Sequence, residues 1–208
     1  MVLSRVGKYG SYYGNDINSS NALNQSQMET NAMYIYAYLH AEGWTINAIA
    51  GILGNMQVES SLNPGRWQSD RVGGSAEGHG YGLVQWTPYT KYQLWVSGDA
   101  STMDNNLSRI MYEINNNIQW IATSTYNFSF KDFSKSNLSP GTLARSFMLC
   151  YERPADQSES AQSYRASLAN NWYTFLTGVI PSDPVISSSK KKKFKFILFK
   201  RRFIRGQR

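Results

Sequence analysis

Residues 45–65 read TINAIAGILGNMQVESSLNPG, and this stretch decides the fold. Thr45 can cap a helix, because its side-chain oxygen can accept a hydrogen bond from a backbone N–H of the first turn. Apolar side chains then recur at helical spacing, at Ile46, Ile49, Leu53 and Met56. The pattern predicts a helix that begins after Thr45 and is stopped by Asn63-Pro64-Gly65.

Glu59 is the residue of chemical interest in this helix. It lies three residues beyond Met56, on the same apolar stripe, and falls in the last turn. Partial burial and the negative end of the helix dipole both disfavour the anion, so we expect its pKa to lie above the ordinary value of about 4.3. A glutamic acid that stays protonated near neutral pH can protonate a glycosidic oxygen. The alternative is a solvent-exposed glutamate at a frayed helix end.

The remainder of the chain predicts a mainly helical α+β fold with a small β-region and no internal repeat. A first amphipathic helix follows a capping box formed by Ser26 and Glu29 and ends at Gly43. Residues 81–86 predict a short strand, and Thr87-Pro88 predicts the start of a helix. Apolar residues at helical spacing predict three later helices, over residues 107–121, 143–151 and 161–178.

Composition divides the chain into four parts. Residues 1–25 are polar and rich in turn-forming residues, so they predict a loosely ordered arm. Residues 26–178 form the predicted domain, and 41% hydrophobic residues in the whole chain are enough for a packed core. Residues 179–189 have the proline and serine content of a linker, and residues 190–208 form a basic amphipathic tail.

The net charge of +7 comes from the tail. Residues 190–208 carry six Lys and four Arg without an acid, whereas residues 1–189 carry 11 basic and 14 acidic residues. A body with a net charge of −3 disfavours a nucleic-acid partner, which needs basic residues across a folded face. The tail, from Lys190 to Arg208, could bind an anionic membrane or anionic wall polymers; the alternative is a disordered solubilising tail.

Several kinds of chemistry are disfavoured. The chain has one cysteine, Cys150, on an apolar helical stretch, and two histidines, His40 and His79, so neither a zinc site nor a cysteine peptidase is expected. We expect no metal and no cofactor. The sequence also predicts no secretory signal peptide and no transmembrane segment, because no apolar run is long enough.

Three motifs together resemble the phage tail-type lysozyme family. They are GILGNMQVES at residues 51–60 with LNPG at residues 62–65, GYGLVQWT at residues 80–87, and YERPAD at residues 151–156. The similarity runs from about Gln27 to Leu176. It implies a lysozyme-like fold with its small β-region beside an active-site cleft.

The resemblance also implies roles for single residues. Glu59 matches the catalytic acid of the family, and Gly82, Gln85 and Trp86 match the strand that borders the substrate cleft. Gln85 carries a donor and an acceptor for sugar hydroxyl or N-acetyl groups. Tyr81 and Trp86 offer apolar faces to pyranose rings, although core packing is the alternative for both.

Other assignments are less specific. Asn63 is expected either to contact substrate or to cap the helix before Pro64, and Tyr151 either to brace the cleft wall or to point its hydroxyl at the sugar. Hydrolysis normally uses a second carboxylate, for which Glu77 and Asp70, both in a glycine-rich loop, are the candidates.

The function that the resemblance implies is cleavage of the β-1,4 bond between N-acetylmuramic acid and N-acetylglucosamine in bacterial peptidoglycan. A lytic transglycosylase that uses Glu59 alone is the first alternative, and a non-catalytic wall-binding tail protein is the second. The expected setting is the virion tail of a phage of Gram-positive bacteria, with other tail proteins as partners, or the host cytoplasm before release to the wall.

Overall fold

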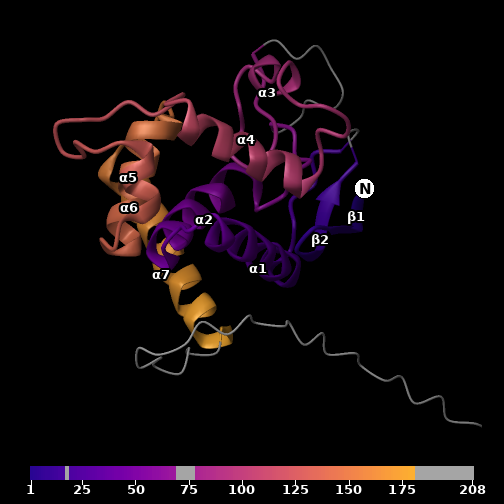
Figure 1. Ribbon diagram of the computed structural model, residues 1–208, viewed down its shortest axis with the longest axis horizontal. Helices are drawn as coiled ribbons and strands as arrows, with labels where there is room; N and C mark the ends of the chain where they lie inside the picture. Colours follow the sequence, from indigo (N-terminus) through magenta and orange to yellow (C-terminus); the bar gives the residue numbers. More distant parts are fainter. Residues whose placement is uncertain (17–18, 69–77, 181–208) are drawn as a thin grey trace, which may run out of the picture.

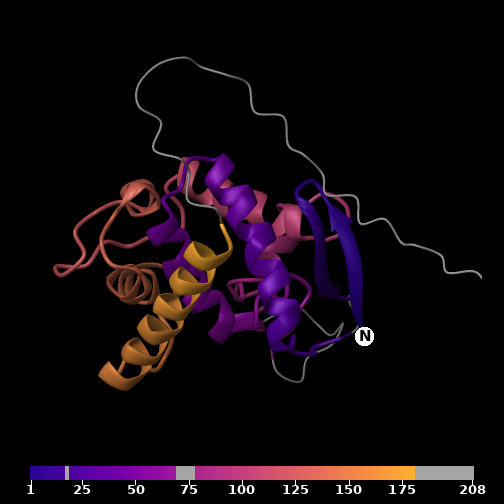
Figure 2. The ribbon, with the colours of Figure 1, turned by 90° about the horizontal axis from the view of Figure 1, so that it is seen from below.

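The computed structural model describes residues 1–16, 19–68 and 78–180. Within these ranges the fold is α+β and mainly helical, as the sequence predicts. The elements follow one another as β1 (Val2–Gly7), β2 (Gly10–Asn15), α1 (Gln25–Ala41), α2 (Ile46–Ser60), α3 (Thr90–Gln93), α4 (Met103–Asn115), α5 (Phe130–Lys135), α6 (Pro140–Phe147), η1 (Met148–Glu152) and α7 (Glu159–Val179). Figures 1 and 2 show the hairpin at one end of the molecule, α5 and α6 at the other, and α2 between them.

Helix α2 is the centre of the fold. It begins as predicted, because the Thr45 hydroxyl accepts the backbone N–H of Ala48 at 3.1 Å. Residues 48–56 are all buried, since α1, α6 and α7 pack around the helix. A Cβ at Gly54 would lie 2.7 Å from the carbonyl oxygen of Arg165 on α7, so only glycine permits this close approach. The packing brings the side chains of α7 to the C-terminal end of α2, where Glu59 lies.

The first 25 residues are not the loosely ordered arm that the sequence predicts. Strands β1 and β2 form an antiparallel hairpin in which Val2 lies opposite Asn15 and Gly7 opposite Gly10. Tyr12 is buried, with its ring edge-on to Tyr34 of α1. The amide of Asn31, also on α1, accepts the N–H of Tyr13 at 2.7 Å and donates to its carbonyl at 2.8 Å. These bonds to α1 satisfy the outer edge of β2, so the hairpin is part of the folded domain.

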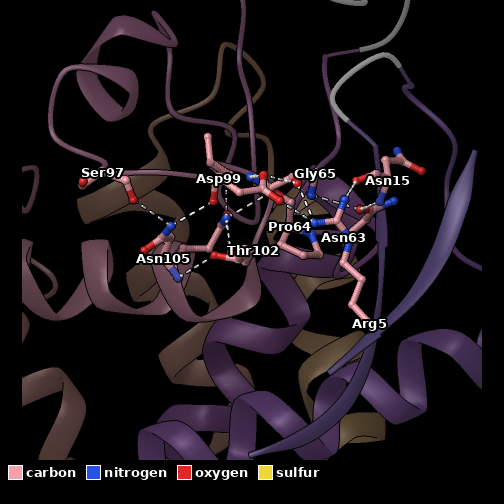
Figure 3. Close-up of polar contacts among 12 residues, drawn as sticks. Arg5, Asn15, Asn63, Pro64, Gly65, Ser97, Asp99, Thr102 and Asn105 are labelled. Atoms are coloured by element: carbon pink, nitrogen blue, oxygen red, sulfur yellow. Dashed lines mark hydrogen bonds and ion pairs between the residues drawn. The ribbon is translucent and has the colours of Figure 1, made fainter. Parts of the chain in front are cut away.

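Asn63 ties the hairpin to the segment after α2. Its Oδ1 accepts the backbone N–H groups of Asn15 and Gly65, both at 3.0 Å, and its Nδ2 donates to the Asn21 carbonyl at 2.9 Å. Figure 3 shows Asn63 beside Asn15 and Gly65, with the guanidinium of Arg5 nearby. The side chain is fully buried, and Ser61 is the C-cap of α2. The expected helix cap was therefore wrong, and the buried Asn63 side chain has no exposed surface for a substrate contact.

The predicted strand at residues 81–86 is a tight turn instead. Tyr81 forms isolated β-bridges with Trp67 and with Trp86, and the turn between them needs positive φ angles at Gly82 and Gln85. The next helix, α3, begins at Thr90 with Tyr89 as its N-cap, so the start predicted at Thr87-Pro88 was wrong.

Other helix boundaries in the structure also differ from those that the sequence predicts. The capping box of α1 is formed by Asn24 and Gln27 rather than by Ser26 and Glu29. Helix α4 ends at Asn115, before Ile118, whereas α6 with η1 and α7 cover the two later predicted segments. None of the helices in the described part of the chain is long and apolar enough to cross a bilayer.

Candidate active site at the end of helix α2

A cavity of about 490 Å³ lies at the C-terminal end of α2. Five segments line it: the end of α2, residues 66–68, residues 78–91, the loop before α5, and the end of η1 with the residues that follow it. The described lining residues are Glu59, Arg66, Gln68, Gly78, Val84, Gln85, Trp86, Thr87, Lys91, Gln119, Glu152, Arg153, Pro154 and Ala155. The lining is polar and contains both cations and carboxyl groups, which suits a ligand rich in hydroxyl and amide groups.

Glu59 reaches this cavity from the last turn of α2, as the sequence predicts. Its side chain is 18% exposed, and its Oε1 accepts a hydrogen bond from Nη2 of Arg165 at 2.7 Å. The Arg165 guanidinium, 7% exposed, also donates to the buried amide of Asn55 at 3.0 Å. Asn55 in turn donates to the Ala144 carbonyl on α6, so three helices fix the carboxyl group in place. The buried cation is a partner that the sequence analysis did not foresee.

Glu152 is a second carboxyl group in the same cavity. It is the last residue of η1, a π-helical turn closed by the Arg153 N–H, which donates to the Met148 carbonyl at 2.8 Å. The side chain is partly exposed, but its Oε1 is shielded from solvent and has no hydrogen-bond partner among the described residues. Burial, followed by the negative charge of Glu59, raises the pKa of Glu152 well above its ordinary value, although Arg165 and Arg153 act in the opposite direction.

Gln85 and Trp86 line the cavity with Glu59, in the place where the resemblance put them. The Gln85 amide donates to the carbonyls of Arg66 and Gly82, both at 3.0 Å, so its donors hold the turn together. Trp86 is only 3% exposed, and one face of its indole stacks on Tyr92 with the ring centroids 4.6 Å apart. Both residues therefore shape the wall of the cavity, with less free polar and aromatic surface than the sequence suggested.

A buried carboxyl group, Glu113 of α4, holds this wall from behind. It accepts hydrogen bonds from the Trp86 indole at 3.0 Å, from Nε of Arg109 at 2.9 Å, and from the Tyr151 hydroxyl. Burial raises the pKa of Glu113 even though all three donors act to lower it. The cluster joins α4, η1 and the residue 81–86 turn behind the cavity.

The structure does not bring the other proposed substrate contacts to the cavity. Tyr81 is fully buried, with its ring packed against Trp67 and Tyr89. Tyr151 is 1% exposed and directs its hydroxyl at Glu113, so it braces the wall and does not point at a sugar. Gly82 lies outside the lining; a Cβ there would lie 2.5 Å from the Asn106 side chain.

The two loop carboxylates of the sequence analysis, Asp70 and Glu77, lie outside the described residues, and so does the basic tail. Among the described residues, no group of three metal-ligating side chains is present. Cys150 is buried, and burial raises the pKa of its thiol.

Three site residues were missed from the sequence: Glu113, Glu152 and Arg165. Glu113 had a detectable signal, because it follows Arg109 by four residues on a helix whose neighbouring Ile110 and Ile114 are apolar, as a buried ion pair requires. Glu152 lies within the quoted YERPAD motif but was given no role. Arg165 pairs with Glu59 across 106 residues, and no local pattern marks that pairing.

A mainly helical domain with a glutamate at the end of a central helix, facing a polar cavity, defines a lysozyme-like protein. The chain belongs to the phage tail lysozyme family, whose model matches residues 30–176. It is also 46% identical over 164 residues to morphogenesis protein 1 of Bacillus phage B103, a match that covers 77% of this chain and 43% of that protein. The match thus spans less than half the length of this relative. Both comparisons identify the chain as a phage-associated protein.

Proposed function

We propose that this protein is a glycosidase that cuts bacterial peptidoglycan at the β-1,4 bond between N-acetylmuramic acid and N-acetylglucosamine. The observation that carries the proposal is Glu59, fixed by Arg165 at the end of α2 and open to a polar cavity in a chain of the phage tail lysozyme family. The polar lining suits the hydroxyl and acetamido groups of a glycan strand, and the substrate is inferred from the family.

Glu59 is the proposed general acid of this reaction. It would protonate the glycosidic oxygen as the bond to the anomeric carbon breaks, and this proton transfer makes the departing sugar a better leaving group. Gln85 and Trp86 would form the wall against which the sugars lie, with the Gln85 side-chain oxygen as an acceptor for a hydroxyl or amide N–H. Arg66, Lys91 and Arg153 add positive charge to the lining, which suits the lactyl and peptide carboxylates of peptidoglycan.

Mass analysis of peptidoglycan digested with the purified chain tests the function. We expect products that end in reducing N-acetylmuramic acid, because water completes the cleavage of the muramyl bond. Products with 1,6-anhydro-muramic ends would identify the enzyme as a lytic transglycosylase instead of a hydrolase, because the C6 hydroxyl of the sugar then attacks in place of water. Reducing N-acetylglucosamine ends would show that the opposite glycosidic bond is cut, and an undigested wall would contradict the enzyme proposal.

A second candidate function is a structural component of the phage particle. The name of the B103 relative, morphogenesis protein 1, favours this candidate. Such a role places the protein in the virion tail, in contact with other tail proteins, and it is compatible with catalysis by the same chain. Only the absence of wall digestion by the intact protein would make it the sole function.

A further inference from the structure

The pairing of Glu59 with Arg165 raises a question about the proton that the proposed reaction needs. The Arg165 guanidinium donates a hydrogen bond to the Glu59 carboxyl group at 2.7 Å, whereas a general acid must begin the reaction protonated. Glu152 is the other carboxyl group that lines the cavity among the residues that the structure describes. One Glu152 oxygen is shielded from solvent and has no hydrogen-bond partner in the described part of the chain, so ionisation would leave that oxygen without a donor.

We propose that Glu152 is the second carboxyl group of the catalytic cavity, and that Glu59 and Glu152 hold one proton between them in the free protein. The two side chains line the same cavity from different elements, Glu59 from α2 and Glu152 from η1. With one proton on the pair and a positive charge on Arg165, the three groups together are neutral. This inference rests on the proposed function, because the shared proton is the one that Glu59 gives to the glycosidic oxygen.

The charges around Glu152 support this distribution of the proton. Burial and the negative charges of Glu59 and Glu113 raise the pKa of Glu152, while Arg165 and Arg153 lower it. Two carboxyl groups that interact in this way lose their protons in two separate steps that belong to the pair. The first step leaves one negative charge, which Arg165 compensates; the second is disfavoured because it adds another negative charge in a shielded place.

In hydrolysis, the proton that the pair gives to the leaving oxygen is then replaced by a proton from water. The pair releases its proton to the leaving glycosidic oxygen as the bond to the anomeric carbon breaks. A water molecule adds its hydroxide part to that carbon and returns its proton to the pair. Glu152 is a positioning residue in this scheme: it determines the pH range over which a proton is available to Glu59.

The dependence of kcat/KM on pH for reducing-end release, measured for the wild type and for Glu152→Gln, tests the proposal. Glutamine has nearly the same shape but cannot share a proton, so Glu59 must hold it alone beside Arg165. We therefore expect the alkaline limb of the profile to move to lower pH by at least about one unit, and the rate at the wild-type optimum to fall at least about tenfold. Glu152→Asp should restore the alkaline limb, and Glu42→Gln, on the exposed C-cap of α1, is the control that should leave the profile unchanged.

An alkaline limb in the Glu152→Gln profile that coincides with the wild-type limb would overturn the proposal, whatever the loss of rate, because a structural role alone would not move it. Carbon-13 NMR of the glutamate carboxyl groups gives a readout that does not depend on activity. In the wild type, the Glu152 signal, identified by its absence from the Glu152→Gln spectrum, should titrate above the exposed glutamates. In Glu59→Gln its midpoint should fall, because a neighbouring negative charge has been removed.

The NMR result separates the two proposals. If the protein cuts no wall but the two carboxyl groups show coupled titration, the glycosidase proposal is wrong and the proposal of the carboxyl pair stands. If the protein cuts the wall but Glu152 titrates together with the exposed glutamates, the proposal of the carboxyl pair is wrong and the glycosidase proposal stands.

Discussion

Replacing Glu59 with glutamine is expected to slow the release of reducing ends from peptidoglycan by about a hundredfold to ten-thousandfold, the contribution typical of a positioned general acid. The amide has nearly the same shape and can still accept the hydrogen bond from Arg165, so the fold should be preserved. It cannot give up a proton to a leaving oxygen, however. Binding of the variant to purified walls should therefore persist while turnover is lost, and both are measured on the same wall preparation.

The control for this experiment is Glu42→Gln, which removes one carboxyl group from the exposed C-cap of α1, outside the cavity. It should keep wild-type activity. Undiminished wall digestion by Glu59→Gln would show that the acid is another group. Absence of digestion by the wild type, the control and the Glu59 variant alike would favour the structural role in the particle over catalysis.

Replacing Glu113 with alanine is expected to lower the free energy of unfolding by about 3–5 kcal/mol, the usual effect of removing one partner of a buried ion pair. Glu113 is 1% exposed, and its loss would leave the buried Arg109 guanidinium, the Trp86 N–H and the Tyr151 hydroxyl without this acceptor. Because the same cluster holds Trp86 at the cavity wall, activity at temperatures where the variant is folded should fall as well. Urea denaturation gives the stability directly.

A surface ion pair provides the matched comparison. Glu159 accepts two hydrogen bonds from Arg145, the shorter at 2.6 Å, but its side chain is 74% exposed. Glu159→Ala should therefore destabilise the fold far less than Glu113→Ala, because solvent screens the pair. A loss for Glu113→Ala as small as that of Glu159→Ala would mean that the buried cluster does not stabilise the fold in the way that its contacts indicate.

Local signals explain what the sequence could predict. The start of α2 depends on one side chain, Thr45, and its length on apolar spacing, so both could be found within 20 residues of sequence. The position of Glu59 in the last turn of α2 follows directly from them. The motif at residues 80–87 likewise led to Gln85 and Trp86, which do line the cavity.

Contacts between distant segments explain what the sequence could not predict. The hairpin of β1 and β2 depends on Asn31 and Tyr34 of α1, which complete the edge of β2 and pack on Tyr12. Gly7, Gly10 and Gly14 lie within eight residues of one another, so this stretch resembles a loop in the sequence. The buried positions of Tyr81 and Tyr151 and the pairing of Glu59 with Arg165 are set by tertiary packing in the same way.

The most direct test of the account is a crystal structure of the Glu59→Gln protein with a peptidoglycan tetrasaccharide. We predict that the sugars occupy the cavity lined by Gln85, Trp86 and Glu152, with one muramyl glycosidic oxygen about 2.6–3.2 Å from the side chain of residue 59. A tetrasaccharide bound on another face of the protein, with no glycosidic oxygen near residue 59, would contradict the assignment of this cavity as the active site.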